Sequence, residues 1–234
     1  ALQADPSLAD IFKTPTIGGL AQRVKQLKGI VEETGTAVRI PSVEKKEYYG
    51  LSSAQKRLFI LQQMDETGTG YNMPRVLRLK GDVDVQRLEQ TFKQLIRRHE
   101  SFRTSFEVIG EEQVQRIHED VEFEIGRDGP GPPCPPLERF ISPFDLSKAP
   151  LLRGGLVTLP GDEYILMIDT HHIISDALSR ERFIADFAAL YARDGEGEED
   201  VLPPLEIAYK DYACRQNSEE EKKKEEEEKA RQKE

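Results

Sequence analysis

The segment THHIISDALS holds three polar residues that could do acid-base chemistry: His171, His172 and Asp176. An imidazole with the ordinary pKa of about 6.5 is largely neutral at pH 7, so it can take a proton from an amine or hold the amine in place. Asp176 stands in the first turn of an expected helix, where the helix dipole favours a carboxylate. This segment is therefore the candidate catalytic site.

Plainer interpretations of the same residues stay open. Paired histidines at the end of a strand are compatible with a purely structural role, and Asp176 alone is compatible with a helix cap or a salt-bridge partner. A shared zinc ion is disfavoured, because adjacent residues of a strand point to opposite faces. We expect no metal site.

Two apolar strands and a helix must position this segment. The runs LLRGGLVTLP and EYILMIDTHH flank a turn at Pro160 and Gly161, and the second is nearly continuous in apolar residues, which is typical of a strand covered on both faces. Apolar residues then recur at helical spacing after Asp176: Phe183, Ile184, Phe187, Leu190 and Tyr191. The predicted order is strand, His-His turn, helix.

Further elements precede this unit in the sequence. Ser52 and Gln55 match a capping box that opens a helix over about 53–64, RVLRLKG predicts a strand, and Asp84 is a plausible cap for a helix that ends near 98–100. FRTSFEVI and EQVQRIHED, joined through Gly110, predict a hairpin. The proline-rich run 126–136 predicts a surface loop.

Composition bounds the class of protein. With 234 residues, 37% hydrophobic and 32% charged, the chain predicts one main globular unit. The net charge of -10 argues against a nucleic-acid partner. No apolar run is long enough for a membrane helix and no signal-peptide pattern opens the chain, so we expect a cytoplasmic protein with no membrane partner. Cys134 and Cys214 are too far apart to suggest a zinc site.

Several segments, in order, resemble motifs of the condensation domains of nonribosomal peptide synthetases. HHIISDALS is similar to the family's HHxxxDG motif, and further matches are SSAQKRLFIL, YNMP, RHESFRTSF, FDLSKAPLLR and YKDYA. The resemblance covers about 48–217. It implies an α+β (mixed α/β) fold, namely a chloramphenicol-acetyltransferase-like lobe in which a mixed sheet packs with helices, as one half of a V-shaped domain of two lobes.

The resemblance also implies roles for the candidate residues. His172 is the general base or the amine-positioning group, and Asp176 shapes the site by pairing with an arginine. For that arginine we expect Arg103, with Arg57 as a weaker candidate. His171 is expected to support the turn rather than to react.

Partners follow from the same family. The start of the chain, with LADIFKTPTIGGLA, resembles the last helices of a peptidyl carrier protein, so the predicted layout is carrier helices at 1–30, a linker at 31–47, the amino-terminal lobe at 48–217 and a charged helical or disordered tail at 218–234. The expected partners are upstream and downstream peptidyl carrier proteins, an adjacent adenylation domain and the second lobe. No cofactor is expected to bind directly; the phosphopantetheine arms of the carriers would bring the substrates.

Two departures from the family pattern matter. Ala177 stands where the motif has glycine, which adds a Cβ near the reactants. The chain also stops before the second lobe of the family, so we expect the isolated chain to be inactive. The alternatives are a noncatalytic carrier-docking lobe, an epimerisation domain, or an acyltransferase of the same superfamily that depends on coenzyme A.

Overall fold

The computed structural model describes residues 16, 18–19, 40–127, 137–192, 202–218 and 222. The chain divides into two units, Ala1–Ile40 and Pro41–Glu234. Most of the expected carrier helices at 1–30, most of the expected linker at 31–47 and nearly all of the expected tail lie outside the described residues, so that layout stays a prediction. The fold below is that of the second unit.

A four-stranded sheet carries the candidate catalytic segment at the end of one strand. Its order is β2-β7-β6-β5, and all neighbours are antiparallel except β5 and β6. The strands are β2 (Arg75–Lys80), β5 (Ile125–Arg127), β6 (Leu152–Leu159) and β7 (Glu163–Thr170). The β6–β7 turn contains Gly161, whose φ of 80° suits glycine. The predicted pair of apolar strands is confirmed.

The centre of β7 is buried on both faces, as the unbroken apolar run predicted. Leu166, Met167, Ile168 and Asp169 are buried one after another. An alternation of buried and exposed residues would mark a sheet with one wet face, and β7 lacks it. The strand therefore runs through the interior up to the His-His turn.

A smaller sheet lies beside the first helix of this unit. Its order is β1-β4-β3, all antiparallel, with β1 (Tyr49–Gly50), β3 (Thr104–Ile109) and β4 (Glu112–Ile117). Gly110 turns the β3–β4 hairpin at a φ of 64°, so the predicted hairpin is confirmed. The strand begins later than FRTSFEVI suggested, because Phe102 and Arg103 belong to a 3-10 turn, η1 (Glu100–Arg103).

Local signals set the starts of the long helices. The helices are α3 (Ser53–Met64), α4 (Val85–Arg98), α5 (Leu137–Phe140), α6 (Ala177–Tyr191) and α7 (Tyr209–Gln216). The capping box of Ser52 and Gln55 is present on α3, and Asp84 caps α4. Both helices therefore begin where the sequence predicted.

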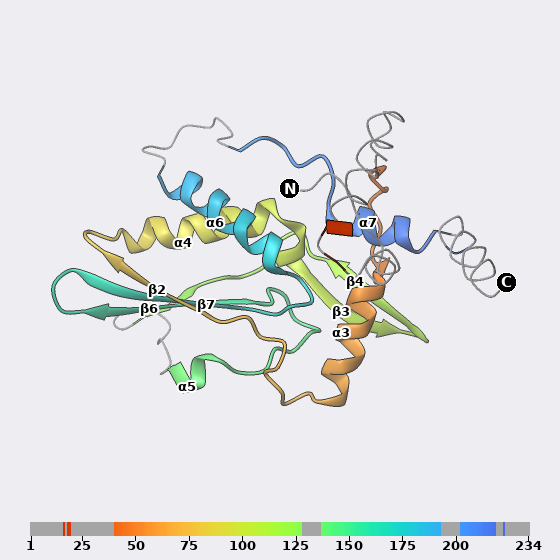
Figure 1. Ribbon diagram of the computed structural model, residues 1–234, viewed down its shortest axis with the longest axis horizontal. Coiled ribbons are helices and arrows are strands. Elements are labelled where there is room, and N and C mark those ends of the chain that lie inside the picture. Colours follow the sequence, from red (N-terminus) through yellow and green to blue (C-terminus); the bar gives the residue numbers. More distant parts are fainter. Residues whose placement is uncertain are drawn as a thin grey trace. The chain divides into compact units, whose positions relative to one another are not determined.

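Helices α4 and α6 run side by side along the four-stranded sheet (Figure 1). The core beneath them is aromatic: Phe92 of α4 stacks with Phe123 and meets Phe183 and Phe187 of α6. The predicted apolar stripe of α6 is only half-buried, and its Ile184 is 47% exposed. The expected mixed α/β fold of sheets packed with helices is confirmed.

Candidate active site

The His-His turn joins β7 to α6 and is held by the chain at 71–72. His171 forms an isolated antiparallel bridge with Asn72, and the His172 N–H donates to the Tyr71 carbonyl at 2.8 Å. The Ile174 N–H donates back to the His171 carbonyl at 3.2 Å, which closes the turn. Backbone hydrogen bonds alone therefore fix the main-chain positions of both histidines.

His171 is a buried structural residue. Its side chain is fully buried; its Nδ1 accepts from the Ile173 N–H at 3.0 Å and its Nε2 lies 3.2 Å from Gln62 Oε1. Because Nδ1 accepts, the proton of the neutral ring is on Nε2, which donates to Gln62. Burial, with the charges of His172 and Arg153, lowers the pKa of His171 to about 4. The ring stays neutral and supports the turn, in keeping with our expectation.

His172 faces the other way, into a cavity. Its side chain is exposed, and it lines a cavity of about 200 Å³. The cavity walls come from α3, from β3 and β4, from the turn 172–176 and from α7. Within the described part of the chain, the His172 imidazole makes no hydrogen bond, so its ring nitrogens are open to a substrate.

Asp176 caps α6 beside the same cavity. Its Oδ1 accepts from the Ser179 N–H at 2.7 Å and from the Ser179 hydroxyl at 2.6 Å. The Ser179 hydroxyl is the main cause of a lowered Asp176 pKa, followed by the backbone N–H of Ser179, and His172 lowers it further by its charge. Asp176 is therefore a carboxylate at neutral pH, and it is also the helix cap that the plainer interpretation named.

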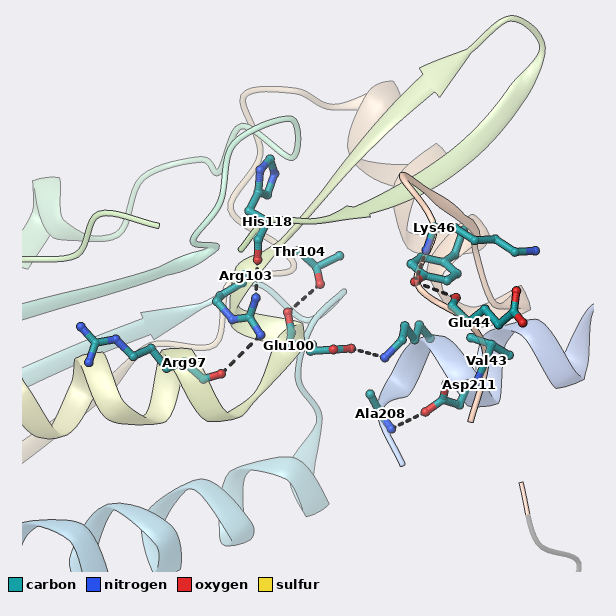
Figure 2. Close-up of polar contacts among 12 residues, drawn as sticks. Val43, Glu44, Lys46, Arg97, Glu100, Arg103, Thr104, His118, Ala208 and Asp211 are labelled. Carbon is teal, nitrogen blue, oxygen red and sulfur yellow. Dashed lines mark hydrogen bonds and ion pairs between the residues drawn. The ribbon is translucent and has the colours of Figure 1, made fainter. Parts of the chain in front are cut away.

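The expected pair of Arg103 with Asp176 is wrong. Arg103 donates instead to backbone carbonyls, with Nε 3.1 Å from the Ile96 carbonyl and Nη1 on the His118 carbonyl. Figure 2 shows its guanidinium between the carbonyls of Arg97 and His118. The free carbonyls at the end of α4 need donors, and a guanidinium with five N–H groups supplies them. Arg57, the weaker candidate, is exposed on α3 and does not line the cavity.

Helix α7 forms one wall of the cavity through two residues of the YKDYA motif to which the sequence assigned no individual role. Tyr209 and Lys210 line it; the Tyr209 hydroxyl lies 3.0 Å from Ser52 Oγ, and Lys210 Nζ lies 2.6 Å from Glu100 Oε2. Figure 2 shows Glu100 at this contact and Asp211 reaching the backbone of Val43 and Ala208. The motif YKDYA was the available signal for both wall residues.

Ala177, the departure from the motif, fits its place without strain. It is the first residue of α6, and its side chain is exposed. Among the described residues that are not glycine, only Asp162 has a positive φ, so Ala177 does not need the freedom of glycine. The added Cβ therefore leaves the turn intact.

Within the described ranges, no group of three or more His, Cys, Asp or Glu is placed to hold a metal ion. In the same part of the chain, no helix is long and apolar enough to cross a membrane.

Comparison with known proteins places these features in a family. Residues 45–230 match the sequence model described as Condensation domain. Tyrocidine synthase 3 of Brevibacillus parabrevis is 46% identical over 215 residues, which is 91% of this chain and 3% of that protein. Surfactin synthase subunit 1 of Bacillus subtilis (strain 168) is 44% identical over 214 residues, 91% of this chain and 6% of that protein. The chain thus spans a small part of the relatives it matches.

Solved structures agree on the fold. The X-domain from teicoplanin biosynthesis is 28% identical, with a TM-score of 0.65 over 76% of this chain and 40% of that one. The starter condensation domain of rhizomide synthetase is 19% identical, with a TM-score of 0.54 over 62% of this chain and 39% of that one. At that identity the second likeness shows the fold alone.

Proposed function

Because the chain belongs to the condensation-domain family of nonribosomal peptide synthetases, we propose that it supplies the amino-terminal catalytic lobe that joins two carrier-bound acyl groups through an amide bond. The donor is an aminoacyl or peptidyl thioester, and the acceptor is the amine of a second aminoacyl thioester. The observation that carries the proposal is the exposed His172 imidazole, open to a substrate in a cavity whose walls come from distant parts of the fold.

The chemistry asks little of the protein beyond placement and one proton transfer. The acceptor nitrogen attacks the donor carbonyl, a C–N bond forms, the C–S bond breaks, and the nitrogen loses one proton. His172 holds the amine or accepts that proton, which then leaves with the thiolate. Holding two tethered reactants in contact can supply as much as about 7 to 11 kcal/mol of the barrier in favourable cases.

Asp176 acts through its charge rather than through an arginine. Its carboxylate interacts electrostatically with His172 and is held at the start of α6 by Ser179. A fixed anion near His172 favours an imidazolium when the proton is taken. Asp176 is thus proposed to stabilise the charged form of His172 in the reaction while it caps the helix.

The size of the cavity suits the reacting ends of two substrates. Whole small-molecule sites have volumes of about 300 to 1,000 Å³, whereas this cavity has about 200 Å³. The phosphopantetheine arms of the two carriers would therefore lie mostly outside it. Carrier proteins upstream and downstream, an adjacent adenylation domain and the second lobe are the proposed partners, and 1–30 is proposed as the end of the upstream carrier.

The test is amide formation between two loaded carriers by a synthetase module that includes this chain. His172→Ala should reduce product formation about 100-fold or more, the scale of a lost acid-base group. His118→Ala is the matched control, because His118 bonds Ser105 and does not line the cavity. Equal activity of His172→Ala and the parent would overturn the catalytic proposal.

A second candidate is a recruiting lobe without chemistry. One solved X-domain from teicoplanin biosynthesis, 29% identical with a TM-score of 0.64, is in a complex with OxyB. A noncatalytic lobe that served only to bind partner proteins would retain carrier binding and lack any dependence on His172. The same pair of variants therefore decides between the two candidates.

A further inference from the structure

A partly buried ion pair lies behind the His-His turn, in which the Asp169 side chain is fully buried and the Arg153 side chain is 24% exposed. Asp169 of β7 is fully buried and stands opposite Arg153 of β6 in the strand register, with Arg153 Nη1 3.4 Å from Asp169 Oδ2. Asn72 donates to the same carboxylate oxygen at 2.6 Å. Alternate residues of a strand share a face, so Asp169 lies on the side of His171, two positions before it.

The removal of the Asp169 carboxylate from water costs free energy. Removing charges from water costs more than a mutual contact repays unless the remaining polar atoms are also satisfied. Here Asp169 Oδ1 and Asn72 Oδ1 are buried without a hydrogen-bond partner in the described structure. A well-packed apolar pair would stabilise the strands at least as well, so stability alone is a weak reason for these residues.

Contacts run from this pair to both histidines. The Arg153 guanidinium lies over the Phe144 ring, 3.7 Å from its centre. The Phe144 and His171 rings pack edge to face, with an angle of 86° between their planes. Arg153 Nη1 and Asn72 Nδ2 both donate to the Ser142 carbonyl, at 2.6 and 2.9 Å, which fixes the loop that carries Phe144.

The second route is through the backbone. Asn72, bonded to Asp169, bridges His171, and its neighbour Tyr71 accepts the His172 N–H. The Asp169–Arg153 pair is therefore connected to the ring of His171 through side chains and to the peptide N–H of His172 through the backbone. We propose that Asp169, Arg153 and Asn72 are positioning residues that set the orientation of the His172 imidazole in the cavity, an inference whose consequence for turnover rests on the proposed function.

Asp169→Asn tests this with little change of shape. We expect the ring signals of His172 in the NMR spectrum of the 234-residue chain to shift and broaden. In the synthetase module we expect kcat to fall about 10- to 100-fold with KM for the loaded carriers little changed, because a misplaced group weakens the reaction more than binding. Arg153→Lys keeps the charge and loses the planar fork, so it should show the same effects in weaker form.

Glu163→Gln is the matched control. Glu163 lies on the same strand and pairs with Arg78 across it, but that Arg78 side chain is 60% exposed and the pair is far along β7 from the turn. This variant should leave the His172 signals and kcat unchanged. If Asp169→Asn does not fold, Arg153→Lys carries the same two measurements.

The ring signals decide the proposal. Unmoved His172 signals in a folded Asp169→Asn or Arg153→Lys chain would overturn it and leave the pair a structural contact. Failure of the proposed function gives a different pattern, in which His172→Ala keeps full turnover while the Asp169→Asn signals still move.

Discussion

Two adjacent histidines have opposite roles because a strand turns neighbouring side chains to opposite faces. His171 points into the core, where Gln62 and the Ile173 N–H fix its neutral form, and His172 points into the cavity. The buried ring thereby stays neutral at pH 7, while its neighbour stays open to a substrate. A pair of histidines in sequence is therefore one support and one candidate reactive group in the structure.

The buried ring should make stability depend on pH. The pKa of His171 falls from 6.5 in the unfolded chain to about 4 in the folded one, so the unfolded chain binds more protons between these values. The contribution of His171 to the free energy of unfolding is fully present above about pH 6.5. It decreases as the pH falls, and about 3 kcal/mol is lost at pH 4. Urea unfolding at a series of pH values measures it.

His171→Gln removes the titrating ring and should flatten this slope. His172→Ala is the control and should retain it, because the buried histidine is unchanged. A slope that survives in His171→Gln would assign the pH dependence to other groups, namely His99, whose pKa burial also lowers, and the carboxylates.

Asp176→Asn separates the helix cap from the charge. Asn and Asp cap helices about equally well, so the free energy of unfolding should change by less than about 0.5 kcal/mol. Loss of the charge near His172 should lower kcat about 10-fold, the equivalent of about 1.4 kcal/mol in the transition state. Steady-state kinetics of amide formation, beside urea unfolding, gives both numbers.

Asp84→Asn is the matched control, since Asp84 caps α4 through the Arg87 N–H at 3.0 Å and does not line the cavity. It should change neither stability nor kcat. An Asp176→Asn variant that is equally active would leave Asp176 with the role of a cap alone.

The candidate residues could be found from sequence, but not all of their partners. The cap at Asp176 follows from local position and is present in the structure, whereas the supporting role of His171 was implied by the family resemblance, and its Nδ1 accepts from the Ile173 N–H. Arg103 could not be assigned, because a long side chain chooses among groups that only the fold brings near, here the carbonyls of Ile96 and His118. Gln62 was missed for the same reason, as it lies 109 positions from His171 in the chain.

At the scale of elements, α3 and α7 are joined at the wall of the cavity. Ser52 is fully buried; its Oγ accepts from the Gln55 N–H at 3.2 Å and lies 3.0 Å from the Tyr209 hydroxyl. One hydroxyl thus caps α3 and contacts the first residue of α7. A change there acts on both helices.

Ser52→Ala should therefore cost more than the loss of an ordinary cap. We expect the free energy of unfolding to fall by about 1 to 2 kcal/mol, since a cap bond and a half-buried hydroxyl partner are lost together. Asp84→Ala, which removes a cap with no contact to another helix, should cost about 0.5 to 1 kcal/mol. Urea unfolding compares them; equal losses would mean that the Tyr209 contact adds nothing.

The long elements could be predicted and the short ones could not. The helices from Ser53 and Val85 and the β3–β4 and β6–β7 hairpins carry caps, turns or periodic apolar residues in their own sequence. The short strands β1 and β5 carry no such pattern, because their pairing with β4 and β6 depends on distant segments. The apolar stripe of α6 is less buried than its helical spacing predicted, because spacing alone does not determine what covers Ile184.

At the scale of the whole molecule, the comparisons show that this chain corresponds to a small part of much longer relatives. The chain spans 39 to 40% of the two solved structures described above, and 3 to 6% of the two synthetases. A net charge of -10 fits protein partners better than nucleic acid. The site is therefore expected to need further polypeptide around it.

The 234-residue chain on its own should form no more amide from two loaded carriers than its His172→Ala variant does. The His172 imidazole is exposed and its cavity has about 200 Å³, so the chain alone neither encloses two tethered substrates nor excludes water from them. A synthetase module that includes the same residues should form product at a rate that His172→Ala abolishes. Retained protection of the His171 ring from protonation at pH 5, followed by NMR, shows that the isolated chain is folded. A folded chain that matches the rate of the module would mean that this lobe is sufficient for condensation.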